Sequence, residues 1–226
     1  LSFWDKPHSI YVSARHRDIH YRLIARELAA LLPSRQARVL DYGSGEALHA
    51  DVVAAAAGEL LLCDGAPNMR AALAARFAGD AKVRALSPED VERLPDSCVD
   101  FIALHSVAQY LPPEQTRALL VLFRRLIDPG GVLLVSDIIP PQVGTAADVA
   151  ALLRFAAANG FFFAAVAGLM RTLLSDYRRL RTRVGLTHYS EPAMIEMLSA
   201  AGFAASRAPR NIGHNQARMA FVARPR

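Results

Sequence analysis

The sequence predicts an α/β fold: one domain, residues 1–226, built on a Rossmann-like, doubly wound sheet of seven strands. Short β-rich runs alternate with longer helical periods, which is typical of parallel strands joined by crossover helices. The last two β-rich runs have no helix-length segment between them, so they are expected to pair antiparallel as a final hairpin. A chain of 226 residues has room for one such domain with a small appendage.

Five parallel strands come first in the chain. A helix over residues 113–127 precedes the fifth of them, and the segment Asp128-Pro129-Gly130-Gly131 closes this helix because a helix cannot continue there. The strands are predicted at residues 38–41, 59–64, 82–86, 99–105 and 132–139.

The chain is less regular after the fifth strand. Residues 145–183 are predicted to form one or two long helices with an apolar middle and a basic end, and we interpret residues 145–189 as a helical insertion. A further helix is expected to begin near Ser190, a good N-cap, with Pro192 in its first turn, and to stop at Gly202. The two final strands are predicted at residues 203–208 and 218–223.

The net charge of +5 comes almost entirely from arginine, and these arginines are dispersed over several predicted helix faces. A continuous basic surface would indicate a nucleic-acid partner, so the dispersal counts against one. Arginines gather only at residues 178–183, where a solvated helix face and an anionic partner both remain open.

Several features predict a cytoplasmic protein. The first residues show neither the basic cluster nor the apolar run of a signal peptide. The apolar stretch 155–174 is interrupted by Asn159, Gly160 and Arg171, so it is not expected to span a membrane. Cys63 and Cys98 lack metal-ligand spacing and are interpreted as reduced thiols.

The segment VLDYGSGEALHA, residues 39–50, is the strongest chemical signal. A strand ends in Asp41, two glycines follow at Gly43 and Gly45, and a helical pattern comes next. Glycines let the backbone approach a ligand closely, although tight strand-to-helix turns also use them for structural reasons alone. Asp64 ends the second strand, where an acid in a Rossmann-like sheet accepts hydrogen bonds from ribose hydroxyls. The pair predicts a nucleotide or cofactor site.

With these motifs the chain resembles the class I S-adenosylmethionine (SAM)-dependent methyltransferases, of the methyltransferase type 11-like, bacterial small-molecule kind. The resemblance covers nearly the whole chain. Leu48 stands where a nicotinamide enzyme would have its third glycine, which favours the methyltransferase over an oxidoreductase. The matching segments are VLDYGSGEA, LLLCDGAPNM, DVERLPDSCVDFIALHSVAQYL and LFRRLIDPGGVLLVSDIIPP.

The resemblance implies that SAM is the cofactor, with S-adenosylhomocysteine (SAH) as product, and it implies a set of binding residues. The methionyl part would lie among Asp41, Gly43 and Gly45, the ribose on Asp64, the adenosine by Gly65, Met69, Asp90 and Val91, with Ser87 as the alternative to Asp90, and the methyl-donor side by His105.

The family often places a lid over SAM before the first strand, which here implies a helical lid in residues 1–34. On a helix, Tyr11, Arg15 and Asp18 would share a face, and Arg15 would pair with the SAM carboxylate; an exposed helix with ordinary surface charges is the alternative. His16 and His20 have i,i+4 spacing but no obvious third ligand, so no metal site is predicted.

The acceptor side is expected at the carboxyl ends of the strands, where open α/β sheets bind ligands. His105 is the first candidate for a general base because the pKa of histidine lies near physiological pH; shaping the pocket is its alternative role. His214 is the second candidate, with a plain hairpin loop as its alternative. Candidate substrate contacts are Tyr110, Asp137, Phe162, His188, Tyr189, Asn211, His214 and Asn215.

The aromatic residues of the insertion indicate a hydrophobic or aromatic acceptor, unless they pack against the domain core or against a second subunit in a homodimer. The sequence therefore predicts methyl transfer from SAM to the O, N or C atom of a small, largely apolar acceptor. An RNA or protein acceptor, and a non-catalytic SAM-binding protein, remain as alternatives because fold alone does not decide the acceptor.

Overall fold

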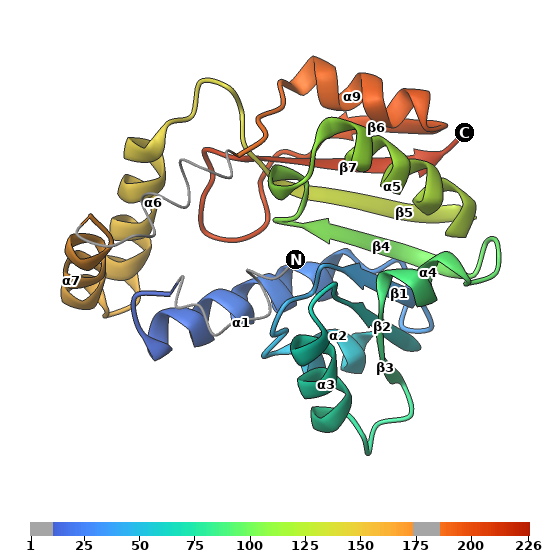
Figure 1. Ribbon diagram of the computed structural model, residues 1–226, viewed down its shortest axis with the longest axis horizontal. Coiled ribbons are helices and arrows are strands. Elements are labelled where there is room, and N and C mark those ends of the chain that lie inside the picture. The colour runs from blue at the N-terminus through green and yellow to red at the C-terminus, as the bar shows by residue number, and fades with distance from the viewer. Residues whose placement is uncertain (1–10, 174–185) are drawn as a thin grey trace.

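The computed structural model describes residues 11–173 and 186–226 and contains a seven-stranded sheet in the order β3-β2-β1-β4-β5-β7-β6 (Figure 1). Strands β1 to β5 pair in parallel, and β7 pairs antiparallel with both β5 and β6, as the sequence predicts. The strands are β1 (Arg38–Tyr42), β2 (Glu59–Cys63), β3 (Val83–Leu86), β4 (Val99–His105), β5 (Ile127–Ile138), β6 (Phe203–Arg207) and β7 (Met219–Pro225).

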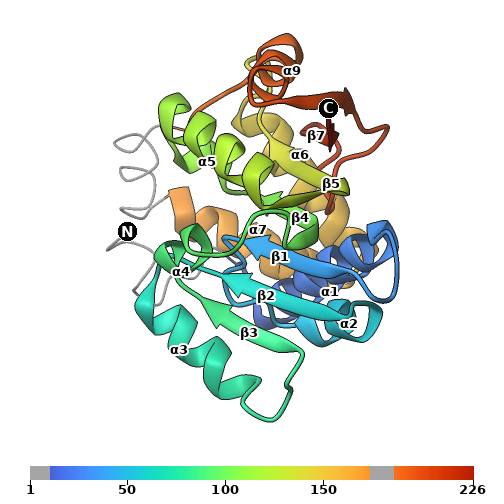
Figure 2. The same ribbon diagram turned by 90° about the vertical axis from the view of Figure 1, so that its right-hand side faces the viewer.

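Helices cover both faces of the sheet (Figures 1 and 2). One face packs against α1, α2 and α3 around Phe101, and the other packs against α4, α5 and α9 around Phe123. Both phenylalanines are fully buried, and burial of such a side chain stabilises the fold by about 1.5–3 kcal/mol. The described helices are α1 (Ala14–Leu31), α2 (Ala50–Ala56), α3 (Pro67–Arg76), α4 (Pro88–Glu92), the 3-10 turn η1 (Ala108–Tyr110), α5 (Pro113–Leu126), α6 (Thr145–Ala158), α7 (Phe162–Leu173) and α9 (Glu191–Ala200).

Side-chain caps fix where several helices begin. The hydroxyl of Ser190 accepts a hydrogen bond from the Ala193 amide at 3.3 Å and starts α9, as predicted. The hydroxyl of Ser13 likewise accepts from the His16 amide at 3.1 Å, so α1 begins at Ala14. The prediction that Tyr11 shares a helix face with Arg15 is therefore wrong, because Tyr11 precedes the cap.

The fifth strand begins earlier than predicted, at Ile127 instead of Val132. Its Pro-Gly-Gly segment ends α5, but it continues as extended backbone beside β4. Ile127 pairs with Val99, and a register irregularity between Val99 and Phe101 accommodates the segment. The turn residues therefore mark the end of the helix correctly without marking a gap before the strand.

Helices α6 and α7 lie beyond the carboxyl end of β4 and pack against α1 (Figure 1). The Arg15 side chain donates from Nε to the Asn159 carbonyl oxygen at 2.8 Å, where α6 ends. A Cβ atom on Gly168 of α7 would lie 2.5 Å from the Val12 side chain, so only glycine permits this close approach. We call α1, α6 and α7 together the cap. The arginine cluster at residues 178–183 lies outside the described residues.

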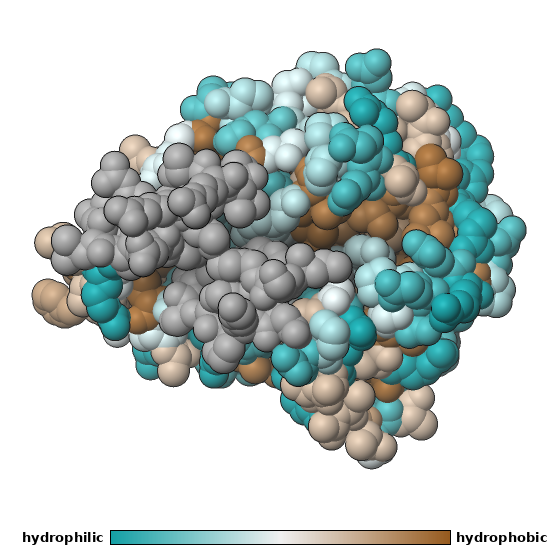
Figure 3. Space-filling model, in the orientation of Figure 1, coloured by the Kyte–Doolittle hydropathy of each residue, from teal (hydrophilic) through white to brown (hydrophobic). Residues whose placement is uncertain are grey.

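The face seen in Figure 3 is largely hydrophilic, with hydrophobic residues gathered in a hollow beside α5. No helix among the described residues is both long enough and apolar enough to cross a bilayer. The prediction that the apolar stretch of the insertion is not a membrane span agrees with this finding: α6 and α7 are separated at Gly160, whose φ of 73° breaks the helix.

Candidate active site

The loop after β1 is held between β2 and α1. Asp64 anchors it, because its carboxylate accepts hydrogen bonds from the Gly45 amide at 3.0 Å and the Ala66 amide at 2.8 Å. The amides of Gly43 and Ser44 donate to the Cys63 carbonyl oxygen at 2.7 and 3.0 Å. Asp64 therefore shapes the loop while its remaining lone pairs stay available for ribose hydroxyls.

Two glycines have backbone angles that the loop requires. Gly43 has φ of 80° and Gly45 has φ of 57°, in the left-handed region. A Cβ atom on Gly43 would lie 2.3 Å from a methyl group of Val107, which follows β4. The loop therefore lies against the segment after β4, and this contact brings two of the predicted cofactor motifs together.

Negative charge is concentrated beneath this loop. Burial, together with the negative charge of nearby Asp64, raises the pKa of Asp41 to about 7. Such a buried acid pair favours a positively charged ligand, because a cation would stabilise the ionised carboxylates. The Ser44 hydroxyl is buried and has no hydrogen-bond partner within the described part of the chain, so it offers a further polar contact to a ligand.

Helix α1 covers the glycine loop through Tyr21, which sequence reasoning missed. The Tyr21 hydroxyl accepts a hydrogen bond from the Glu46 amide at 3.3 Å, and a Cβ atom on Gly45 would lie 3.2 Å from the same oxygen. The ring of Tyr11 lies 5.8 Å from that of Tyr21. A cavity of about 50 Å³ adjoins this cover, and its lining includes Tyr21, Asp41, Gly43, Ser44 and His105.

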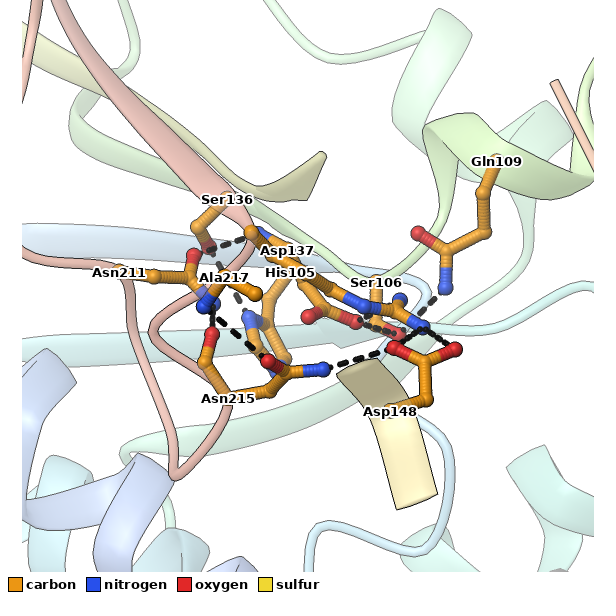
Figure 4. Close-up of polar contacts among 10 residues, drawn as sticks. His105, Ser106, Gln109, Ser136, Asp137, Asp148, Asn211, Asn215 and Ala217 are labelled. Atoms are coloured by element: carbon orange, nitrogen blue, oxygen red, sulfur yellow. Dashed lines mark hydrogen bonds and ion pairs between the residues drawn. The ribbon is translucent and has the colours of Figure 1, made fainter. Parts of the chain in front are cut away.

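A polar network joins the carboxyl ends of β4 and β5 to the cap (Figure 4). The Ser106 hydroxyl donates to Asp137 at 2.7 Å, and Arg218 bridges Asp137 at 3.0 Å to Asp148 of α6 at 3.1 Å. Asp137 was predicted to contact substrate, but its carboxylate is already used by these partners. The bridging Arg218 and its second partner Asp148 carried no sequence signal, because their role depends on three elements meeting.

The two predicted asparagines belong to the same network. Asn211 accepts from the Asp137 amide at 2.9 Å and donates to the Asn215 carbonyl at 3.0 Å. Asn215 donates to Asp148 at 2.8 Å. Both amides are buried, and they support the Asp137 backbone, whose φ of 63° is unusual for a residue other than glycine.

The two candidate bases reach this end of the sheet from different strands. His105 ends β4, and its Nδ1 atom lies 2.9 Å from the Ser136 hydroxyl. Its pKa is lowered, chiefly by burial and further by the Arg218 charge, while Asp137 opposes the change. His214 lies in the β6–β7 loop, where burial likewise lowers its pKa and where its ring stacks on Phe155 at 4.5 Å. Both imidazoles are therefore neutral at physiological pH and able to accept a proton.

Some predicted cofactor contacts already have other partners. Asp90 accepts from the Ser87 amide in the capping box of α4, and the Ser87 hydroxyl accepts from the Asp90 amide, so both adenine candidates are used there. Arg15 points to the turn between α6 and α7. Val91 is fully buried on the α5 side of the sheet, Met69 packs partly buried against the core on the other side, and Gly65 lies between β2 and α3.

The predicted substrate contacts are scattered. Tyr189 is buried on the α5 side of the sheet, with its hydroxyl 3.0 Å from that of Thr116, so it contributes to the core. His188 is exposed, and so are Phe162 on α7 and Tyr110 in η1. Of the eight predicted contacts, Asp137, Asn211, His214 and Asn215 lie together at the carboxyl end of β5.

The fold and this site define a Rossmann-like domain whose glycine loop after β1 is of the kind that binds nucleotides. Residues 40–135 match a family model described as a methyltransferase domain. No curated protein matches the sequence. Solved structures of the same fold include the magnesium protoporphyrin IX methyltransferase of Synechocystis PCC 6803 with bound SAH, at 16% identity and a TM-score of 0.61 over 100% of this chain and 92% of that one.

Two further structures are similar. The 1,6-didemethyltoxoflavin-N1-methyltransferase of Burkholderia thailandensis, with its acceptor and SAH bound, has 20% identity and a TM-score of 0.56 over 92% of this chain and 81% of that one. A DhpI–SAH complex has 18% identity and a TM-score of 0.61 over 99% and 94%. At these identities the structures show the fold, and the family match concerns residues 40–135. The chain therefore carries a methyltransferase domain match at residues 40–135 and has the fold of SAM-dependent methyltransferases.

The residues present fit SAM. Its ammonium and sulfonium groups are positive, as the acid pair of Asp41 and Asp64 favours, and its ribose can use the lone pairs of Asp64. Ser44 supplies a buried hydroxyl whose hydrogen bond is unmade among the described residues. Bound there, SAM would supply an electrophilic methyl group.

Proposed function

We propose that the protein methylates a small, largely apolar acceptor held between the carboxyl ends of β4 and β5 and the cap. This proposal rests on one observation: aromatic rings gather on the inner side of the cap, which is the side that faces the strand ends. Phe155 of α6 and Phe161, which precedes α7, meet the rings of His16 and His214 there, at centroid distances between 4.5 and 6.1 Å. Small-molecule sites are mostly apolar and aromatic with a few placed polar groups, which is the composition found here.

In this proposal His105 is the residue that meets the acceptor on the methyl-donor side. The Ser136 hydroxyl holds Nδ1, so Nε2 is the atom that accepts a proton from the acceptor. Methyl transfer is an in-line displacement that depends mainly on proximity and orientation. The Asp137–Arg218–Asp148 bridge serves orientation, because it fixes α6 against the strand ends.

A nucleic-acid or protein acceptor is less well supported. Several arginines of the described residues have carboxylate partners, which reduces the positive charge available to phosphates. Such pairs are Arg38–Asp100, Arg84–Glu59, Arg93–Asp90, Arg125–Asp96 and Arg207–Glu191. Two similar structures are named for small acceptors, magnesium protoporphyrin IX and 1,6-didemethyltoxoflavin, which agrees with the proposal.

The insertion also offers a surface for a homodimer. Phe163 and Met170 of α7 are 86% and 58% exposed, and Phe162 and Val166 add to the same apolar surface. Light scattering after size-exclusion chromatography tests this assembly: a dimer that Phe163→Ser converts to a monomer supports it, and a monomeric native chain excludes it.

The acceptor class is tested by measuring SAH formation from SAM. The native chain is incubated with a panel of small aromatic and aliphatic molecules that carry hydroxyl, amine or thiol groups, and separately with total RNA and with unfolded protein. Turnover on members of the small-molecule panel supports the proposal. Turnover on RNA or protein alone, or none on any acceptor while SAM binds, contradicts it.

A further inference from the structure

The inner side of the cap carries two histidines to which the proposed function assigns no role in catalysis. His16 and His20 lie one turn apart on α1, with ring centroids 6.0 Å from each other. The ring of His214, from the β6–β7 loop, lies 6.2 Å from His16 and 5.8 Å from His20. Three imidazoles from two distant segments therefore form one cluster, and His20 is also near enough to His105 to interact with it electrostatically.

Aromatic rings enclose this cluster. His16 stacks on Phe161 with a centroid distance of 5.1 Å and an interplanar angle of 19°, and His214 stacks on Phe155 with an angle of 16°. Burial lowers the pKa of all three histidines, so the cluster is uncharged at neutral pH. Within the described ranges no group of three His, Cys, Asp or Glu side chains is placed to hold a metal ion.

Two imidazole nitrogens in the cluster have no hydrogen-bond partner in the part of the chain that the structure describes. The Nδ1 atom of His16 accepts from the Val12 amide at 3.4 Å, so its proton is on Nε2. That Nε2 atom and the Nδ1 atom of His20 are both buried without a partner among residues 11–173 and 186–226. Buried polar groups in proteins are normally satisfied, and an unsatisfied group costs free energy, so a ligand that satisfies both would gain affinity.

We propose that His16, His20 and His214 form the acceptor-binding wall of the active site, and that this wall takes a phenol, a flat aromatic ring bearing a hydroxyl group. Phe155 and Phe161, which stack on His214 and His16, give the wall an aromatic surface against which a flat ring can pack. A hydroxyl both donates and accepts, so it can donate to Nδ1 of His20 and accept from Nε2 of His16. This assignment rests on the proposed function, which places the acceptor between the cap and His105.

Binding of matched probes tests the wall. Calorimetry in the presence of saturating SAH compares 2-naphthol with 2-methoxynaphthalene, which has the same rings but no hydroxyl proton. The native chain is expected to prefer 2-naphthol by about tenfold, the contribution of one buried hydrogen bond. His20→Phe, which keeps a ring but removes the nitrogens, is expected to abolish that preference and leave the affinities for SAH and 2-methoxynaphthalene unchanged.

Two controls separate this result from a folding defect. His49→Phe replaces a histidine outside the cluster, whose Nε2 atom lies 2.8 Å from a carboxylate oxygen of Asp18. This variant is expected to keep the preference for 2-naphthol. Nitrogen-15 spectra of histidine in the native SAH complex provide a readout without any variant: added 2-naphthol is expected to shift the side-chain signals of His16 and His20 and to leave that of His49 in place.

Several outcomes overturn the inference. One is equal affinity of the native chain for the two probes, and another is a preference that survives His20→Phe. A third is that 2-naphthol does not bind at millimolar concentration and does not shift the His16 and His20 signals. If SAH binds normally in those experiments, only the acceptor wall is wrong. If SAH does not bind the native chain, the proposed function itself fails.

Discussion

The buried histidine His16 should make the protein sensitive to mild acid, and His16→Phe should remove that part of the sensitivity. Its side chain is 6% exposed and stacks on Phe161, which a phenylalanine ring can imitate. Burial, with the nearby His214, lowers the pKa of His16 from 6.5 to about 4. In the unfolded chain the pKa returns to about 6.5.

The sign follows from proton uptake. Between pH 6.5 and 4 the unfolded chain binds a proton that the folded chain does not, so the free energy of unfolding falls as the pH falls. The free energy of unfolding that His16 costs the folded chain in this way is about 2.5 kcal/mol between about pH 7.5 and pH 4.5. Asp41 acts in the opposite direction, because burial raises the pKa of that acid to about 7 and the folded chain then binds the extra proton. The native chain alone therefore conceals the effect of His16.

Urea unfolding followed by circular dichroism at a series of pH values isolates the contribution of His16 to the pH dependence of stability. The difference in unfolding free energy between the native chain and His16→Phe should shift by about 2.5 kcal/mol in favour of the variant as the pH is lowered from about 7.5 to 4.5. His188→Phe, at an exposed position, controls for the substitution as such. A difference that stays constant over this interval, or shifts in favour of the native chain, refutes the assigned burial of His16.

Three other substitutions test the framework of the site. Asp148→Ala removes one carboxylate from the bridge that Arg218 makes to the strand ends, and should lower the unfolding free energy by about 1–3 kcal/mol in urea titrations. Gly43→Ala forces a side chain into a backbone angle of 80° and against Val107, and should weaken SAH binding in calorimetry at least about tenfold. Phe123→Ala opens a cavity on the α5 side of the sheet and should cost about 3–5 kcal/mol in thermal or urea unfolding.

Each of these has a matched control on the same chain. Glu191→Ala breaks an exposed pair with Arg207 and should cost less than about 1 kcal/mol. Gly79→Ala places a Cβ atom with no neighbour within 4 Å, and SAH binding should be retained. Val121→Ala removes a side chain that is 61% exposed. If a control is as damaging as its partner, the corresponding contact does not have the assigned role.

The sheet could be predicted from the sequence because its signals are local. Val39 to Asp41 and Val99 to His105 are short apolar runs, and their alternation with helical segments predicts parallel strands and a crossover fold. The start of β5 was misplaced because Pro129 and the glycines after it end a helix and are compatible with a strand as well. The helix at Ser190 was predicted correctly because capping chemistry acts within three residues.

The site was only partly predictable because its contacts connect distant segments. Asp41, Gly43, Gly45 and Asp64 follow strands whose carboxyl ends meet, so the topology alone brings them together. The packing of His16 against Phe161 depends on how the insertion folds back on α1, which no local pattern specifies. Arg218 and Asp148 were missed for the same reason, since a buried ion pair becomes visible only when the elements that carry it are placed.

Binding of SAM by the glycine loop and Asp64 can be measured directly. Calorimetry with SAM and SAH, with NAD as the control ligand, tests it on the native chain, on Asp64→Ala, and on Asp64→Asn, which keeps one oxygen for the loop amides. We predict that the native chain binds both SAM and SAH but not NAD, and that Asp64→Ala weakens both at least about tenfold. Binding of NAD, or an affinity for SAM that does not depend on Asp64, would contradict a SAM site at this loop.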